Sequence, residues 1–369
     1  MIQYGTPEAA GLSQGRLGVA YGLLGRWVEE GKVPGAAIQV TRGGVWMPPR
    51  GFGRMAPAPD AAPLPPDAIF LVASVTKPLT CLAAVMLVER GLIALDQPVN
   101  EIVPEFAGRG KEAIRVIHLL THTSGLPDMV PANLELRRRH AGLDAFIRHT
   151  CECDLLFPPG TSVSYQSMGI AMLGEIVRRI DGTPLPAFLD REVFGPLGMR
   201  DTSLGLKEEM RLRLAAVRLP EGQQGTDWNW NTDYWLKLGV PWGGMLSTAQ
   251  DITLLLRTIL NGGAFEGTRI IGTATARAMI TNMVAAMPDV PGPVKLANAW
   301  GLGWHLGVPT SSGYFGDLVS PRMFGHGGAT GTAVWADPDL DLTCAVFTTQ
   351  PGIGRMLGLV SNAVAGAAV

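Results

Sequence analysis

The sequence predicts an α+β fold in which segments near both ends of the chain build one sheet and helices occupy the middle. Near the N-terminus, "GAAIQVTR" at 35–42 alternates and is rich in β-forming residues, which is typical of a strand. Near the C-terminus, "TAVWADPD" and "LTCAVFTTQ" predict two strands joined by a short Asp/Pro turn. Residues 110–220 are mostly helix-like or loop-like. Strands at both ends therefore favour a sheet assembled from the two termini, with a helical insert between them.

The helices expected along the chain have ordinary start and stop signals. From Gln14 to Glu30, apolar residues recur at three- and four-residue steps, and Ser13 before them is an N-cap. After a proline-rich loop, "SVTK" opens a second helix that runs toward Arg90 and ends at Gly91. "GIAMLGEIVRRIDG" is the clearest amphipathic helix of the middle section, and "GRMLGLVSNAVAGAAV" predicts a closing helix.

The composition describes a globular protein whose partner is a small or uncharged molecule. Apolar residues make up 47% of the 369 residues and charged residues 17%, which is far from the signature of disorder. Lys plus Arg (30) nearly balances Asp plus Glu (32), so we expect no nucleic-acid or membrane partner. These features do not determine the oligomeric state.

The cysteines and the targeting signals favour a cytoplasmic location. The four cysteines, Cys81, Cys151, Cys153 and Cys344, lack the spacing of a zinc site, and we interpret them as reduced. The first thirty residues show no basic start followed by an unbroken apolar stretch. No apolar run approaches the roughly 20 residues of a membrane span.

The segment "SVTK" at 74–77 indicates a nucleophile beside a base. Positions i and i+3 share one face of a helix, so Ser74 Oγ and Lys77 Nζ can meet if Ser74 lies in the first turn. A serine hydroxyl is a weak nucleophile until a neighbouring base takes its proton. A lysine serves as that base only if burial or positive charge lowers its pKa. Because S-x-x-K is common by chance, a plain helix start with a solvated lysine is the alternative.

Three further stretches accompany this motif. "PPGTSVSYQSMGIAMLGEIV" places Tyr165 before an amphipathic helix, "LLTHTSGLPD" follows another helix, and "FGHGGATGT" precedes the C-terminal hairpin. In order and spacing, the set resembles the serine β-lactamase-like superfamily: SVTK matches S-x-x-K, YQS stands for Y-x-N, and HGG stands for K-T-G. The variant motifs look most like the family VIII carboxylesterases, which share their fold with class C β-lactamases. The similarity covers nearly the whole chain.

This resemblance implies an α/β sandwich of the β-lactamase and penicillin-binding transpeptidase type, with an antiparallel sheet flanked by helices. The chain is then one catalytic domain, 1–369. Its α/β subdomain takes in residues 1–70 and 240–369, and its mainly helical subdomain takes in residues 71–239.

The resemblance also implies a mechanism without metal or cofactor. Ser74 would be acylated, while Lys77 and Tyr165 together would move its proton. The backbone N–H groups of Ser74 and Ala329 would form the oxyanion hole. The expected activity is hydrolysis of carboxylic esters, with short acyl chains, through an acyl-enzyme.

Departures from the motifs give the expected substrate contacts. Ser167 replaces an Asn that in β-lactamases contacts the substrate side chain and the catalytic lysine. His326 replaces a Lys, and a neutral imidazole binds an anionic acid group less well than an ammonium does. Both changes favour neutral esters over penicillins. With Gly327, Gly328 and Trp242, these two residues make up the expected substrate-binding set.

Other patterns have structural interpretations. "GLSQG" at 11–15 is a literal G-x-S-x-G, but no strand precedes it. His118 and His122 are spaced i, i+4 as in some metal sites, yet no HExxH glutamate or third ligand accompanies them. The aromatic stretch "DWNWNTDYWLKLGVPWGG" fits a core or a pocket lining equally well. "GLGWHLG" at 301–307 is interpreted as a strand with glycines at tight contacts.

Three alternative functions stay open at the level of sequence. A β-lactamase or D-amino-acid peptidase would use the same three catalytic residues. An acyltransferase is possible because an acyl-enzyme does not specify what attacks it. A non-catalytic binding protein could keep the fold, although a scaffold has no need of Ser74, Lys77 and Tyr165 together.

Overall fold

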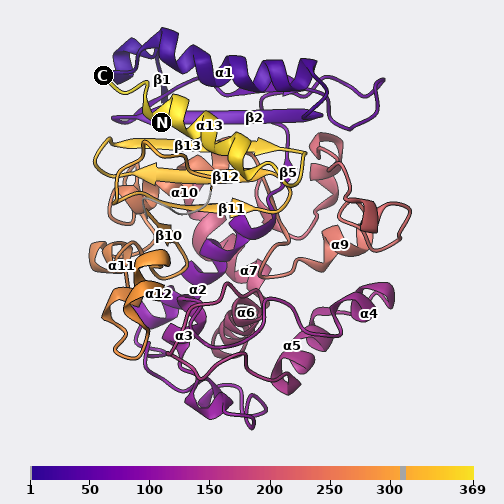
Figure 1. The fold of residues 1–369 in the computed structure, drawn as a ribbon, viewed down its shortest axis with the longest axis vertical. Helices are drawn as coiled ribbons and strands as arrows, with labels where there is room; N and C mark the ends of the chain where they lie inside the picture. Colours follow the sequence, from indigo (N-terminus) through magenta and orange to yellow (C-terminus); the bar gives the residue numbers. More distant parts are fainter. Residues whose placement is uncertain (1, 308–312) are drawn as a thin grey trace.

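The central sheet joins strands from the two ends of the chain, as the sequence predicts (Figure 1). The computed structural model describes residues 2–307 and 313–369, and its main sheet has the order β1-β3-β2-β13-β12-β11-β10, with β4 also paired to β2. β1 and β3 are parallel, and the other pairs are antiparallel. The strands of this sheet are β1 (Gln3–Tyr4), β2 (Gly35–Arg42), β3 (Val45–Trp46), β4 (Arg50–Gly53), β10 (His305–Leu306), β11 (Phe324–Gly328), β12 (Thr332–Asp337) and β13 (Leu342–Thr348).

Two smaller sheets accompany the main sheet. One has the order β5-β7-β6 and the other is a two-stranded ribbon. Their strands are β5 (Phe70–Leu71), β6 (Ser203–Leu204), β7 (Met245–Ser247), β8 (Ala264–Phe265) and β9 (Thr268–Arg269). The α-helices are α1 (Gln14–Glu29), α2 (Lys77–Glu89), α3 (Val116–Leu120), α4 (Asn133–Arg138), α5 (Leu143–Glu152), α6 (Met168–Asp181), α7 (Leu185–Leu189), α8 (Gly195–Leu197), α9 (Asp233–Leu238), α10 (Ala249–Leu260), α11 (Thr273–Met279), α12 (Gly292–Ala297) and α13 (Gly354–Ala365).

Helices cover both faces of the main sheet, and the alternation of apolar residues in the strands explains why. α1 and α13 pack on one face, where Ile38 and Val346 are buried with them (Figure 1). α10 packs on the opposite face, where the neighbouring residues Ala37 and Phe347 belong to a second, larger core. Successive side chains of a strand point to opposite faces, so β2 and β13 supply apolar residues to both cores. The predicted α+β class is therefore confirmed.

Helices α2 to α6 lie below the sheet in Figure 1. α2 packs against α6, and every α2 residue from Lys77 to Leu87 is buried. A helix that is buried all round belongs to a core rather than a surface. The predicted subdomain limits at 70/71 and 239/240 stay a prediction. Within the described ranges, no helix combines the length and hydropathy that crossing a bilayer requires.

Most elements predicted from local patterns are present. β2 has the predicted bounds, and Ser13 caps α1 by accepting a hydrogen bond from Arg16 N at 3.4 Å. The two C-terminal strands and the closing helix are β12, β13 and α13. The helix expected to begin at Ser74 differs: residues Ala73–Thr76 form a 3₁₀ turn, and α2 begins at Lys77. All four cysteines are buried and without disulfides, which agrees with their interpretation as reduced.

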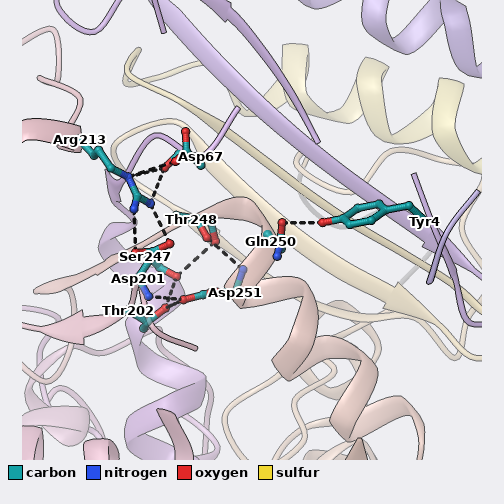
Figure 2. Close-up of polar contacts among 9 residues, drawn as sticks. All are labelled: Tyr4, Asp67, Asp201, Thr202, Arg213, Ser247, Thr248, Gln250 and Asp251. Atoms are coloured by element: carbon teal, nitrogen blue, oxygen red, sulfur yellow. Dashed lines mark hydrogen bonds and ion pairs between the residues drawn. The ribbon is translucent and has the colours of Figure 1, made fainter. Parts of the chain in front are cut away.

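A polar network joins the β5-β7-β6 sheet to the N-terminus of α10 (Figure 2). Asp251 Oδ2 accepts hydrogen bonds from Asp201 N and Thr202 Oγ1, both at 2.9 Å. Thr248 caps α10 by accepting from Asp251 N at 3.1 Å, and Arg213 pairs with Asp201 at 2.8 Å. Burial raises the pKa of Asp251 to about 6, while its hydrogen bond with Thr202 lowers it. The network therefore holds a buried carboxyl group that titrates at mildly acidic pH.

Candidate active site

Ser74 lies in the 3₁₀ turn directly before α2, and Lys77 is the first residue of that helix. Lys77 is buried, and its Nζ lies 2.9 Å from Ser74 Oγ and donates to the carbonyl oxygen of Trp242 at 3.0 Å. Burial lowers the pKa of Lys77 to about 7, although the charge of Asp128 raises it. The amine is therefore partly neutral near pH 7, the state in which it can accept the proton of Ser74.

The backbone before Ser74 has an unusual conformation. Ala73 has a φ of 48°, which lies in the left-handed region that residues other than glycine seldom adopt. Thr76 Oγ1 donates to the carbonyl oxygen of Ala73 at 2.6 Å and accepts from Met245 N at 3.0 Å. Strand β7 thus stabilises the turn that presents Ser74. Strained residues supported in this way are common at active sites.

Tyr165 approaches the same pair from the loop before α6. Its ring lies beneath Lys77 Nζ, 4.7 Å from the ring centroid. Burial of the phenol end raises the pKa of Tyr165, although the residue as a whole is 37% exposed, and interaction with the Ser74 hydroxyl lowers it. The three residues of the predicted catalytic set are therefore brought together, with the amine and the phenol both beside the serine hydroxyl.

Hydrogen bonds from two threonine hydroxyls hold the turn after β11 beside Ser74. Thr330 Oγ1 donates to the carbonyl oxygen of Leu71 at 2.6 Å, and Thr332 Oγ1 donates to that of Val72 at 2.9 Å. These bonds place Ala329 and Ser74 on the lining of one cavity. Within the part of the chain that the structure describes, the Ala329 N–H has no hydrogen-bond acceptor. An unpaired amide next to a nucleophile is what an oxyanion hole requires.

A cavity of about 310 Å³ opens in front of Ser74. Aromatic and imidazole rings dominate its walls, and its lining residues are Ser74, Tyr165, Trp300, His305, Tyr314, Phe315, His326, Gly327 and Ala329. No member of this set has a carboxylate, an ammonium or a guanidinium group. Such a cavity suits a small, uncharged acyl or alcohol group.

His326 lies in β11 and presents a neutral ring to the cavity. Its Nδ1 lies 2.7 Å from the carbonyl oxygen of Gly327, which can only accept, so Nδ1 carries the hydrogen. Burial and the charge of Lys77 lower the pKa of His326 to about 3. The site thus has no positive charge at the position where the K-T-G motif has its lysine.

Three residues of the predicted substrate-binding set lie outside the cavity lining. Ser167 Oγ donates to Asp128 Oδ1 at 2.7 Å, so its hydroxyl already has a protein partner. The Trp242 ring packs against Phe146 at 5.6 Å between centroids, and only its carbonyl oxygen contacts Lys77. Gly328 lies against the backbone of Val72, where a Cβ would overlap the carbonyl oxygen. Their direct contact with substrate stays a prediction without support from this geometry, whereas His326 and Gly327 do line the cavity.

The sequence interpretation missed the residues that form most of the cavity wall. Trp300, His305, Tyr314 and Phe315 line it, and none of them belongs to the motifs that identified the site. The aromatic stretch at 227–244, for which pocket lining was one of two options, contributes no ring to this lining. A signal for Trp300 would have been its distance in sequence from the HGG motif. A single sequence does not show that this distance has a meaning.

The two histidines considered as metal ligands do not share a helix face. His118 lies in α3, whereas His122 follows the helix with a φ of 61°. Among the described residues, no group of three or more His, Cys, Asp or Glu side chains is arranged to hold a metal ion. His118 thus lies in a helix and His122 in the turn after it, against the cavity residues Tyr165 and Trp300.

Comparison with known proteins agrees with the geometry. Esterase EstB of Burkholderia gladioli is 30% identical over 354 residues, which cover 87% of each chain. Penicillin-binding protein 4 of Amycolatopsis lactamdurans is 32% identical over 274 residues, which cover 70% of this chain and 68% of that protein. The crystal structure of a family VIII carboxylesterase superposes with a TM-score of 0.76 at 22% identity, over 97% of this chain and 99% of that one.

The fold and the Ser74 site define a serine hydrolase built on the β-lactamase fold. The family model described as Beta-lactamase matches residues 22–360, nearly the full length of the chain. The chain therefore belongs to the β-lactamase family. The resemblance inferred from the motifs is confirmed.

Proposed function

We propose that the chain is a serine carboxylesterase that cleaves small, uncharged esters through an acyl-enzyme on Ser74. One observation carries this proposal: Ser74 Oγ lies 2.9 Å from the amine of a buried Lys77 and faces an aromatic cavity. Of the relatives described above, EstB is an esterase at 30% identity over most of both chains. No cofactor takes part in the proposed reaction, and the partner is the ester itself.

In the acylation step, Ser74 Oγ attacks the ester carbonyl carbon and Lys77 Nζ takes the hydroxyl proton. The charge that develops on the carbonyl oxygen is stabilised by the N–H groups of Ser74 and Ala329. The tetrahedral intermediate expels the alcohol, which receives a proton from the Lys77 and Tyr165 pair. Lys77 is the more available base, because its pKa of about 7 leaves part of it neutral near pH 7, whereas burial raises the pKa of Tyr165 and keeps the phenol protonated.

In the deacylation step, a water molecule replaces the alcohol at the acyl carbon. The same pair of side chains takes one proton from this water and returns one to Ser74 Oγ, so the carboxylic acid leaves and the enzyme is restored. The interaction of the Tyr165 phenol with the Ser74 hydroxyl and the contact of its ring with the Lys77 amine support a part for Tyr165 in this proton transfer. Two half-reactions of this kind predict ping-pong kinetics.

The neutral cavity favours neutral esters over substrates with a carboxylate. His326 and the aromatic lining supply no cation to pair with the acid group of a penicillin or of a peptide C-terminus. A β-lactamase or D-amino-acid peptidase is nevertheless the second candidate. Penicillin-binding protein 4, at 32% identity, supports it.

A substrate comparison tests the proposal. Purified protein is assayed with p-nitrophenyl butyrate and with nitrocefin, alongside Ser74→Ala and the control Ser13→Ala, which alters only the cap of α1. We expect kcat/KM for the ester to exceed that for nitrocefin and to fall at least about 1,000-fold in Ser74→Ala, with no such loss in the control. A higher kcat/KM for nitrocefin than for the ester would instead favour a β-lactamase or D-amino-acid peptidase. Unchanged ester hydrolysis in Ser74→Ala would refute both.

A further inference from the structure

His122 is a buried imidazole that the proposed mechanism does not use. His122 lies in the "HTSG" turn after α3 and is 1% exposed. The ring centroid lies 4.8 Å from that of Tyr165 and 4.3 Å from that of Trp300. His122 therefore lies directly behind two residues of the cavity wall.

His122 contacts the Tyr165 segment at three points. Its carbonyl oxygen accepts a hydrogen bond from Ser164 N at 2.9 Å, and its Nδ1 accepts one from Gln166 N at 3.2 Å. Its ring packs on the Tyr165 ring between these two bonds. The backbone on both sides of Tyr165 is thus bonded to the same residue.

The segment of residues 162–166 around Tyr165 lacks regular secondary structure, although the Gln166 side chain after Tyr165 bonds to Ser124 and to the carbonyl oxygen of Leu119. Residues 162–166 belong to no helix or strand, so ladder or helix hydrogen bonds do not fix them. The Gln166 side chain bonds to the carbonyl oxygen of His118 at 3.2 Å, which anchors one end of the segment. The Tyr165 ring also contacts Trp300, His326 and the Lys77 amine, but His122 is the one ring neighbour in the described part of the chain that also bonds to the backbone on both sides of Tyr165.

We propose that His122 is a positioning residue, which holds the Tyr165 phenol at Ser74 through its Nδ1 acceptor and its ring. This role rests on the part that Tyr165 plays in the proposed function. A displacement of about 1 Å in a reacting group can cost up to about 100-fold in rate, so a loose phenol would slow both acylation and deacylation.

The chemistry of the ring fits the role. Nδ1 accepts a backbone N–H, so it has a lone pair and the ring hydrogen is on Nε2. A protonated imidazole would have no acceptor at Nδ1 and would lose this bond. Burial and the charge of Lys77 lower the pKa of His122 well below its ordinary value, so the acceptor form persists.

His118 provides a matched control four residues earlier. Its Nδ1 also accepts a backbone N–H, from Arg115 at 3.2 Å, but its side chain neither lines the cavity nor contacts Tyr165. Loss of either imidazole removes the same kind of hydrogen bond. Only the loss at His122 releases the phenol.

Two substitutions separate the acceptor from the ring. His122→Asn keeps an acceptor oxygen near the place of Nδ1 and tolerates the φ of 61°, whereas His122→Phe keeps a ring without an acceptor. We expect kcat to fall about 30- to 100-fold in His122→Phe with KM changed less than about threefold, and to fall less than about tenfold in His122→Asn. His118→Asn and His118→Phe should stay within about twofold of the wild type.

The decisive readout is the rate at which a fluorophosphonate labels Ser74, followed by mass spectrometry beside the thermal midpoint of each variant. This rate needs the nucleophile and its proton acceptors but no particular substrate. Slow labelling in His122→Phe, partial recovery in His122→Asn and normal labelling in both His118 variants would support the role. Wild-type labelling in a folded His122→Phe, equal losses at the two histidines, or no recovery in His122→Asn would overturn it. No labelling of the wild-type protein would instead refute the proposed function on which the role rests.

Discussion

The acylation of Ser74 is expected to follow the protonation of Lys77, and a pH profile makes this dependence measurable. Lys77 has to be neutral to accept the serine proton, and its pKa is lowered to about 7 by burial. A rise in pH removes the proton from Lys77 and so increases the fraction of active enzyme. Activity should therefore rise with pH through neutrality and level off above it.

The size of the effect follows from the pKa. With a pKa near 7, about one Lys77 in eleven is neutral at pH 6 and about ten in eleven at pH 8, so kcat/KM should rise about tenfold between these values. Burial keeps the pKa values of the titratable side chains that line the cavity outside this range. Burial lowers the pKa of His305 to about 4 and that of His326 to about 3, and it raises the pKa of Tyr165.

The assay is the pH dependence of kcat/KM for an uncharged ester, compared between the wild type and Asp128→Asn. The charge of Asp128 raises the pKa of Lys77, so its removal should shift the rise in activity to lower pH. Asp339→Asn is the control, since Asp339 is a surface carboxylate paired with Arg322. A flat profile between pH 6 and 8, or a shift to higher pH in Asp128→Asn, would refute the role of Lys77 as the base.

Three further predictions concern the surroundings of the site. The pKa of Asp251 is raised to about 6 in the folded protein, so the wild type should lose stability relative to Asp251→Asn as the pH rises from 4 to 7, by up to about 3 kcal/mol, with no further change above pH 7. Urea unfolding at each pH measures this difference, and a difference independent of pH would contradict it. In Gly328→Ala, the new Cβ would overlap the carbonyl oxygen of Val72 and push β11 from the turn of the nucleophile, so kcat should fall at least about tenfold. Steady-state kinetics that match the wild type would exclude this tight contact. Trp300→Ala enlarges the cavity and should raise KM for short esters more than for longer ones. Equal changes in KM across a series of acyl lengths would show that Trp300 does not contact the acyl group of the substrate.

Patterns within a short stretch of sequence predict the helices and strands whose buried face is set by that stretch alone. β2 and α1 were correct in position because a period of two or of three to four residues reports directly which face is buried. The turn at Ser74 is less predictable, because its 3₁₀ geometry is supported by a hydrogen bond that Thr76 Oγ1 accepts from Met245 N of β7, a strand about 170 residues away. A sequence window contains no information on such a partner.

The same limit applies to the candidate site. The sequence predicts Ser74, Lys77 and Tyr165 as one set because two motifs carry them, SVTK at 74–77 and YQS at 165–167. Trp300 and Tyr314 reach the cavity only through long-range packing, and no motif marks them. The hydroxyl of Ser167 bonds to Asp128 in a different loop, and this contact is not marked by any motif either.

The most direct test of the central claim is to locate the acyl group after brief reaction with a slowly deacylating ester. Peptide mass spectrometry should find one acyl adduct, on Ser74, that is absent from Ser74→Ala. An adduct on another residue, or hydrolysis that persists without any adduct in the wild type, would contradict a mechanism through this serine.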